Sequence, residues 1–444
     1  MEQTTAKKNK YEIDMCNGTI MDKLISFSLP LMLSGILQLM FNAVDIIVVG
    51  RFSGSQALAA VGSTSALINV FTNLFIGISL GANVLTARFY AAGREKEVSE
   101  TVHTAITLAL VSGIVMALVG LVFSKGALAL MGTPDDVIGL SALYMRIYFL
   151  GMPFFMLYNY GAAILRAVGD TKRPLLFLMI AGVINACLNM VLVIVFKLGV
   201  AGVAIATVIS QMISCVLVLR CLCRSESSYR LRFSELGMKG YYLKQIFSVG
   251  VPAGIQSTVI NFSNVLLQSS VNSFGSTAMA GYTAANNLLG FLYVSVNSIT
   301  QACRSFTSQN YGVGKLKRMD RVLADCMILS VVVAVVLGCI CYGFGPEILQ
   351  IYTEDAEVIA CGMEILAYTT ITYFLCGWMD LFPGALRGMG YSAVPMVLSV
   401  IGTVGTRVVW IFGIFPYHRS LAILFISYPA SWIITIILQV VCFY

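Results

Sequence analysis

The chain has 444 residues, of which 58% are hydrophobic and 11% are charged, and its formal net charge is +7. Soluble domains are typically about one quarter charged, and a soluble core of this length cannot bury so much apolar surface, because much of the chain stays in contact with water. The composition excludes an ordinary soluble enzyme, a nucleic-acid-binding protein and a disordered scaffold. It indicates an all-α polytopic membrane protein with about a dozen spans, at roughly 20 residues each.

Stretches without charged residues mark the expected spans in chain order. Residues 52–87 and 101–124 are two such stretches, and residues 245–303 form a 59-residue stretch that is long enough for two helices and a turn. The pattern predicts twelve transmembrane helices, at residues 24–49, 57–83, 102–123, 139–160, 175–196, 200–220, 245–271, 278–302, 323–343, 358–380, 394–413 and 420–442.

Basic residues lie mostly on one side of these expected helices. The N-terminus, which includes Lys7, Lys8 and Lys10, and the loops after the even-numbered helices hold 22 Lys and Arg residues, whereas the opposite loops hold four. Basic loops stay in the cytoplasm, so we expect both termini to be cytoplasmic. A short apolar core followed by a small-residue cleavage site is missing, so we expect no cleaved signal peptide.

The two halves of the chain resemble each other when the sequence is aligned with itself so that residue 90 matches residue 311. At this one offset, residues 90–94, 131–138 and 163–169 align with residues 311–315, 352–359 and 384–390. Since each half holds six expected spans, both halves enter the membrane in the same sense. An axis along the membrane normal should relate them, as in transporters built from parallel repeats, so we expect a transporter. We expect an N-lobe (1–222) and a C-lobe (223–444) around a central cleft, with residues 221–244 as a cytoplasmic linker.

The first expected helix carries Gln38, Asn42 and Asp45 on one face, because they are spaced four and three residues apart. A charge at the centre of a membrane helix costs about 2.5–3.5 kcal/mol on insertion scales, and such residues are usually functional. We therefore predict that Asp45 couples transport to an ion. Pro30 lies earlier in the same helix, where it allows bending.

Uncharged side chains with oxygen atoms that can bind a cation lie on other expected helices and could complete an ion site with Asp45. Asn185 and Asn189 share one helix face, and Thr207 lies on the next helix. These oxygens suit a hard cation or a proton held on Asp45. Hydrogen bonding between helices is the alternative role for each amide or hydroxyl taken alone.

The C-lobe offers a second group of polar residues. Asp380 and Arg407 lie within expected spans, either as an ion pair or as functional residues, and Arg387 lies at the end of a span, where we expect it to contact lipid headgroups. The charge-free helices at 245–302 carry many amides, which suggests that they line the cleft. We predict that the substrate contacts Gln38, Asn42, Asn159, Gln256, Asn261 and Asn286, with Met and aromatic residues forming an adaptable apolar pocket.

The residues suggest no enzyme chemistry and no cofactor. The chain has two histidines, both near the ends of expected helices, and it lacks the phosphate-binding loop of an ATP-driven pump. Transport should then be driven by an ion gradient, with H⁺ or Na⁺ as the coupling ion and Na⁺ at Asp45 as the only expected metal. We expect small amphipathic or cationic substrates and membrane lipids as partners, no nucleic acid, and a monomer.

Several motifs make the chain similar to the multidrug and toxic compound extrusion (MATE) family of bacterial type. They are Asp-Ile-Ile-Val-Val-Gly-Arg (45–51), Leu-Ala-Ala-Val-Gly (58–62) and Leu-Arg-Ala-Val-Gly-Asp-Thr-Lys-Arg-Pro (165–174), with a second-half counterpart at 386–390. The resemblance covers nearly the whole chain. It implies two six-helix lobes in the plasma membrane and the export of organic cations in exchange for H⁺ or Na⁺.

The resemblance also implies which residues form the ion site. In bacterial members an acid of helix 1 works with residues of helices 5 and 6, which here correspond to Asp45, Asn185, Asn189 and Thr207. The family often has a second carboxylate at the position of Asn189, so this site carries one formal charge less. Another branch places acids in helices 7 and 10. Because helix 7 is charge-free here, the N-lobe site is favoured.

Two other functions fit parts of the pattern. A flippase of lipid-linked oligosaccharides from the same superfamily would need a strongly cationic cleft for pyrophosphate, and only Arg146 and Arg407 lie within expected spans. A non-transporting membrane sensor would normally carry a soluble effector domain, whereas the longest expected loop has about 24 residues.

Overall fold

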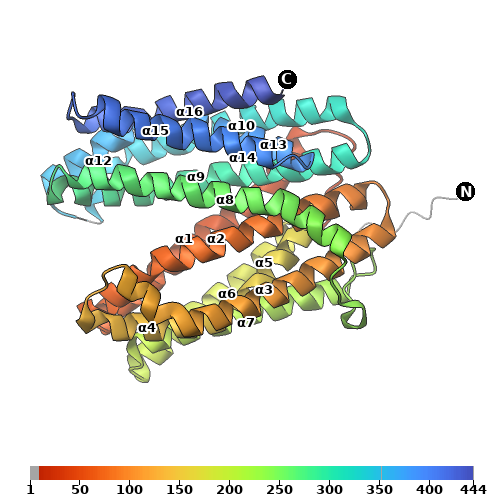
Figure 1. The fold of residues 1–444 in the computed structure, drawn as a ribbon, viewed down its shortest axis with the longest axis horizontal. Coiled ribbons are helices and arrows are strands. Elements are labelled where there is room, and N and C mark those ends of the chain that lie inside the picture. Colours follow the sequence, from red (N-terminus) through yellow and green to blue (C-terminus); the bar gives the residue numbers. More distant parts are fainter. Residues whose placement is uncertain (1–9, 352, 444) are drawn as a thin grey trace, which may run out of the picture. The chain divides into compact units, whose positions relative to one another are not determined.

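The computed structural model describes residues 10–351 and 353–443, except for the side chains of residues 55 and 66, so Lys7, Lys8 and Tyr352 lie outside the described residues. The described chain is helical and contains no strand (Figure 1). Its α-helices are α1 (Met21–Phe52), α2 (Ser55–Ala91), α3 (Glu95–Leu130), α4 (Asp135–Leu150), α5 (Met152–Ala167), α6 (Lys172–Asn189), α7 (Gly199–Cys223), α8 (Gly240–Asn272), α9 (Ser276–Gly312), α10 (Leu316–Gly343), α11 (Gly345–Gln350), α12 (Ala356–Thr369), α13 (Tyr373–Gly388), α14 (Ala393–Ser399), α15 (Thr406–Val409) and α16 (Leu421–Phe443). Three π-helical segments, η1 (Met190–Val195), η3 (Val400–Gly405) and η4 (Trp410–Ile414), continue α6, α14 and α15, and η2 (Phe233–Glu235) is a 3₁₀ turn.

All twelve expected spans are present as helices, but two of them are not straight. The span predicted at 139–160 consists of α4 and α5, bent by 47° at Gly151, and the span predicted at 358–380 consists of α12 and α13, bent by 50°. Gly151 and Pro153 explain the first bend, because proline lacks the N–H that would continue the hydrogen-bond ladder. The two predicted spans are therefore present, each as a bent pair of helices.

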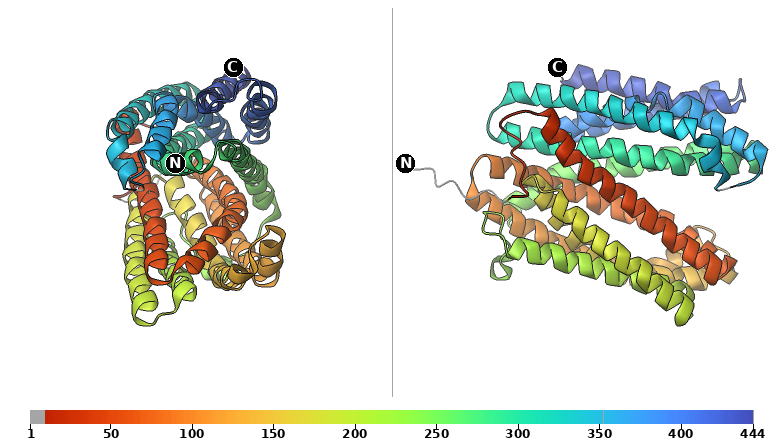
Figure 2. Two further views of the ribbon diagram at one scale, coloured as in Figure 1. Left: turned by 90° about the vertical axis from the view of Figure 1, so that its left-hand side faces the viewer. Right: turned by 180° about the vertical axis from the view of Figure 1, so that it is seen from behind.

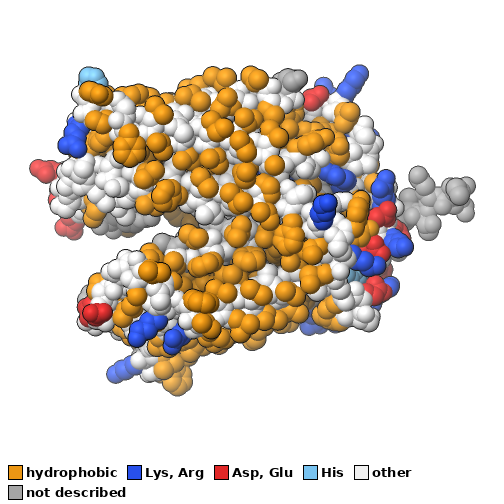
Figure 3. Space-filling view, viewed as in Figure 1, with side chains coloured by type: hydrophobic (Ala, Val, Ile, Leu, Met, Phe, Trp, Pro, Cys, Tyr) orange, Lys and Arg blue, Asp and Glu red, His pale blue; other side chains and the backbone are white. Residues whose placement is uncertain are grey.

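Most of the spans are long and apolar enough to cross a membrane. Eight single helices meet that description, and the two bent pairs raise the number to ten among the described residues. α8 and α9 have 33 and 37 residues, but their amides and hydroxyls lower their hydropathy, and they supply the remaining two spans. Figure 3 shows hydrophobic side chains over the middle of the helices and charged ones near their ends.

The internal repeat is visible in the backbone. Three pairs of glycines related by the repeat offset have positive φ angles: Gly54 and Gly275 (87° and 99°), Gly93 and Gly314 (68° and 75°), and Gly169 and Gly390 (99° and 97°). Packing repeats as well, because α2 contacts α3, α4 and α5 in the first half, and α9 contacts α10, α12 and α13 in the second. Each half therefore folds into the same arrangement of helices, which Figure 2 shows from two further sides.

The chain forms two compact units whose boundaries differ from the lobes expected at 1–222 and 223–444. Unit 1 comprises residues 1–14 and 33–254, and unit 2 comprises residues 15–32 and 255–444. α1 and α8 are thus each divided between the units. Pro30 and Pro252 lie inside these helices, each two residues before the division. Both long helices therefore carry a proline next to the point where they pass from one unit to the other.

Close packing assigns the divided helices to their units. In unit 1, a Cβ added at Gly77 of α2 would lie 2.4 Å from Cα of Gly254 in α8, so only glycine allows the two backbones to approach this closely. In unit 2, Phe27 of α1 packs edge-to-face on Phe306 of α9, with ring centroids 5.7 Å apart. Residues 240–254 accordingly complete unit 1, and residues 15–32 complete unit 2.

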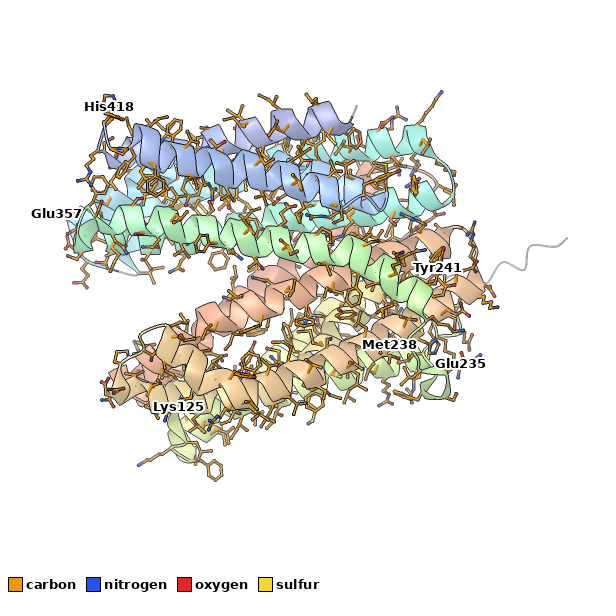
Figure 4. The ribbon with its side chains drawn as sticks, viewed as in Figure 1. Lys125, Glu235, Met238, Tyr241, Glu357 and His418 are labelled. Carbon is orange, nitrogen blue, oxygen red and sulfur yellow. The ribbon has the colours of Figure 1, made fainter. Side chains whose placement is uncertain are left out.

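The expected linker folds back onto unit 1. The backbone N–H of Arg232 donates to Nε2 of His103 at 3.0 Å, and Nζ of Lys239 donates to the Glu100 carboxylate at 3.1 Å. Figure 4 shows Glu235, Met238 and Tyr241 together at one end of unit 1, with Lys125 at the other end. The loops of unit 1 therefore alternate between two ends, as the spans require.

Candidate functional site

The predicted ion-site residues come together in unit 1 around Asp45 of α1. Nδ2 of Asn189 donates a hydrogen bond to Oδ1 of Asp45. The same amide nitrogen lies 3.1 Å from Oδ1 of Asn185, one turn earlier on α6. Asn185 and Asn189 are buried, and Asp45 is half-buried. The predicted four-residue spacing on one helix face is therefore confirmed as a connected chain of polar groups.

Thr207 of α7 completes this polar cluster. Its side chain interacts with that of Asp45, and its hydroxyl donates a hydrogen bond to the carbonyl oxygen of Val203 on its own helix at 3.0 Å. Oδ1 of Asn189 is buried and accepts no hydrogen bond. The cluster thus holds a carboxylate and an unused amide oxygen, which are the ligand types that a hard cation prefers.

Asp45 has no basic partner among the residues that the structure describes, since no Lys, Arg or His nitrogen lies within 4 Å of it. Two aromatic residues lie within electrostatic reach instead, Tyr144 and Tyr148 of α4. Their rings stack with centroids 6.1 Å apart. An unpaired carboxylate next to aromatic rings can attract a cation that carries an apolar body. Sequence reasoning missed these tyrosines, although their four-residue spacing was a signal.

The predicted substrate-contacting residues lie in both units. Gln38 and Asn42 of α1 have exposed side chains, as do Asn261 of α8 and Asn286 of α9. Asn159 of α5 is half-buried, and its amide nitrogen donates to the carbonyl oxygen of Phe155 on its own helix at 2.8 Å. Asn159 is therefore not part of the hydrogen-bonded cluster at Asp45.

Gln256 has a structural partner in unit 2. Its buried side chain accepts a hydrogen bond from the guanidinium of Arg387 on α13. Arg387 was expected at the lipid headgroups, and this expectation was wrong because the side chain is 9% exposed and turns into the unit.

The alternative of an Asp380–Arg407 ion pair was also wrong. Asp380 interacts electrostatically with Arg387, which lies seven residues later on the same helix face. No nitrogen of Arg407 lies within 4 Å of a carboxylate oxygen in the described part of the chain. Arg407 instead points towards α8 and α16, where it meets neutral partners.

Arg407 is the second prominent ionisable residue within a span, and it is 3% exposed. Its Nη1 lies 3.2 Å from Oγ of Ser263 and 2.7 Å from Oδ1 of Asn264, both on α8. Its guanidinium carbon lies 4.7 Å from the centre of the Tyr428 ring on α16. Its neighbours were not predicted from sequence.

π-helical segments adjoin both clusters. η1 begins directly after Asn189, and η3 and η4 flank the short helix that carries Arg407. A π-helical turn pairs each N–H with the carbonyl five residues earlier, costs stability, and occurs frequently at functional sites. These three segments lie on repeat-related helices, so this feature is shared by both units.

Comparison with known proteins identifies relatives over most of the chain. The MatE family model matches residues 30–191 and again residues 252–412, so each half matches the same family, at nearly the offset found in the sequence. Probable multidrug resistance protein YoeA of Bacillus subtilis is 32% identical over 93% of this chain and 91% of its own length. Multidrug export protein MepA of Staphylococcus aureus is 22% identical over 85% of this chain and 84% of its own.

Solved structures show the same fold. A multidrug resistance MATE family transporter of the MOP superfamily in an outward-facing conformation superposes with a TM-score of 0.89, at 19% identity, over 99% of this chain and 97% of that one. A MATE structure in a bent conformation gives 0.84 at 19% identity, over 95% and 93% of the two chains.

Proposed function

Because this chain belongs to the MatE family of membrane transporters, we propose that it exports amphipathic toxic compounds, organic cations in particular, in exchange for H⁺ or Na⁺. The names of the relatives support this proposal, since YoeA and MepA are described as multidrug resistance and multidrug export proteins. The uneven distribution of Lys and Arg supports a plasma-membrane orientation with both termini in the cytoplasm.

The observation that carries the proposal is the unpaired Asp45 carboxylate. It accepts a hydrogen bond from the Asn189 amide, interacts with Thr207 and has no basic partner in the described residues. A carboxylate in this position needs a proton, a metal cation or a cationic substrate, because an uncompensated charge in a membrane interior is costly.

Exchange follows from competition for this carboxylate. When Asp45 is ionised it attracts an organic cation, and when it is protonated or bound to Na⁺ it releases that cation. Coupling requires such mutual exclusion, because two ligands that bind equally in every state shift no equilibrium. Asn185, Asn189 and Thr207 complete the oxygen shell of the bound ion, and the exposed amides of Gln38 and Asn42 face the substrate.

Asp45→Asn tests the proposal in proteoliposomes that carry a proton or a sodium gradient. Asn is nearly isosteric but cannot ionise, so efflux of a fluorescent organic cation should stop while thermal stability and membrane insertion remain. Asp320→Asn, which changes an exposed acid at the start of α10, is the matched control and should transport normally. Normal transport by Asp45→Asn under both gradients would make Asp380 the leading candidate instead.

A further inference from the structure

We propose that Arg407 forms a binding site in unit 2 for the carboxylate of an organic anion, so that the transported compounds include amphipathic anions and zwitterions as well as cations. This inference extends the proposed function and rests on it for the transport step alone. The binding site itself is argued from the surroundings of Arg407.

The charge of Arg407 has no counterion within 4 Å among the residues that the structure describes. Its polar contacts, Ser263 and Asn264, are both neutral. Asp380, the acid that the sequence had offered as a partner, interacts with Arg387. Burying an ion costs several kcal/mol when no opposite charge compensates it. A guanidinium kept in this position is therefore ready for an anion supplied from outside the chain.

Arg407 and the nearby tyrosines also have hydrogen-bond donors that lack an acceptor. Nε of Arg407 is buried and has no acceptor. Oη of Tyr282 lies 3.1 Å from Oη of Tyr428, and such a pair uses only one of its two protons. The other phenol proton remains for a second acceptor. A carboxylate offers two oxygens in one plane, and a guanidinium matches that geometry better than any other side chain.

The site lies just beneath the surface of unit 2. Asn264 is half-buried, and its neighbours on α8, Phe262 and Val265, are each 61% exposed. A ligand that reaches the half-buried Asn264 side chain can therefore approach the guanidinium that this side chain contacts at 2.7 Å. The apolar and aromatic surroundings favour a small carboxylate with an apolar body over a strongly hydrated inorganic anion.

The internal repeat strengthens the assignment. At the repeat offset, which places residue 90 on residue 311, Arg407 corresponds to position 186, next to Asn185 of the Asp45 cluster. In unit 1, Asp45 on α1 accepts a hydrogen bond from Asn189 on α6. In unit 2, Arg407 on α15 donates a hydrogen bond to Asn264 on α8, which is the repeat partner of α1. Equivalent helix pairs therefore carry opposite charges, and both adjoin π-helical segments.

Binding can be measured with the full-length protein in nanodiscs of zwitterionic lipid. All three tryptophans, Trp378, Trp410 and Trp432, lie in unit 2, and the Trp432 ring is 5.8 Å from that of Tyr428, so intrinsic fluorescence reports on this site. Benzoate should change the fluorescence saturably in the native protein. Arg407→Gln should weaken benzoate binding by about tenfold or more, whereas binding of benzylammonium should not change.

A second variant keeps the test valid if Arg407→Gln does not fold. Asn264→Asp leaves Arg407 in place but supplies an internal carboxylate, so it should raise the thermal stability and abolish benzoate binding. Arg146→Gln removes an exposed arginine within α4 of unit 1 and is the matched control, which should bind benzoate normally. Native-like benzoate binding by Arg407→Gln or Asn264→Asp, or none by the native protein, would overturn the proposal.

The test separates this inference from the proposed function. Asp45→Asn should retain benzoate binding while losing cation efflux. Conversely, Arg407→Gln should retain gradient-driven efflux of a cation that carries no carboxylate. Loss of benzoate binding in Asp45→Asn would show that the anion site is not independent, and would count against it.

Discussion

Asn189 determines how firmly the Asp45 carboxylate is held. Its amide donates to Oδ1 of Asp45, and a hydrogen bond to a charged group contributes about 1.5–3 kcal/mol. This bond favours the ionised form of Asp45, which is the form that binds a cation. Without it the carboxyl takes up a proton more readily, so Asn189→Ala should weaken equilibrium binding of a fluorescent organic cation, by up to about tenfold to a hundredfold, as measured by fluorescence anisotropy of the purified protein. Asn297→Ala, which removes a half-buried amide of α9 in unit 2, should bind normally, and equal losses in both variants would contradict this role.

The sequence predicted the Asp45 cluster better than the surroundings of Arg407, for a physical reason. Asn185 and Asn189 lie on the regular part of α6, where a four-residue spacing places two side chains on one face. Arg407 follows a π-helical segment, which adds a residue to the turn and rotates the face of everything after it. The residues that Arg407 contacts lie on α8 and α16, and a pattern within one helix does not identify them.

At the scale of helices, the crossing of α2 and α8 depends on glycine. Gly77→Ala would place Cβ 2.4 Å from Cα of Gly254, so the helices must separate, at a cost of about 1–3 kcal/mol. We expect a lower midpoint of thermal unfolding for this variant. Gly62→Ala lies in the same helix with no atom within 4 Å of the added Cβ, and it should be neutral or slightly stabilising. Equal midpoints for the two variants would argue against this crossing.

Helix existence followed from composition, whereas helix shape did not. Charge-free stretches predicted all twelve spans, because the membrane interior excludes charge whatever the packing. The polar α8 and α9 were recognised by the absence of charge even though their hydropathy is modest. The bend at α12 and α13 depends on tertiary packing, and neither proline nor glycine occurs among residues 369–373 to signal it.

At the scale of the molecule, the internal repeat could be predicted from the sequence. The division of α1 and α8 between the two units could not be predicted. The repeat offset recurs in the paired glycines of positive φ and in the two family matches. The division of α1 and α8 between units depends on which helices their ends contact, such as Phe27 on Phe306. A repeat assigns equivalent positions to each other but does not determine the contacts of a helix that leaves its own half.

The segment before α1 is anchored in each unit, by Glu12 in unit 1 and by Met15 in unit 2. Both oxygens of the Glu12 carboxylate accept hydrogen bonds in unit 1, from the hydroxyls of Tyr90 and Tyr229 at 2.7 Å. Burial raises the pKa of Tyr229, so its phenol stays protonated and remains a donor. Three residues later, the carbonyl oxygen of Met15 accepts from Nδ2 of Asn310 in unit 2 at 3.1 Å. The chain between these two anchors spans at most about 11 Å, so a larger separation there must break one of them.

The two anchors should open independently. Glu12→Ala removes the acceptor of both phenols and should release residues 11–14, so the backbone N–H of Ile13, which donates to the carbonyl oxygen of Gly169 at 3.3 Å, should exchange with solvent about tenfold faster or more. Asn310→Ala weakens only the unit 2 anchor and should leave the exchange of Ile13 unchanged. Hydrogen–deuterium exchange measured by mass spectrometry distinguishes the two variants. If Ile13 exchanges equally fast in both variants, residues 11–17 open as one cooperative segment. The Glu12 and Met15 anchors would then not open independently, which would contradict the prediction.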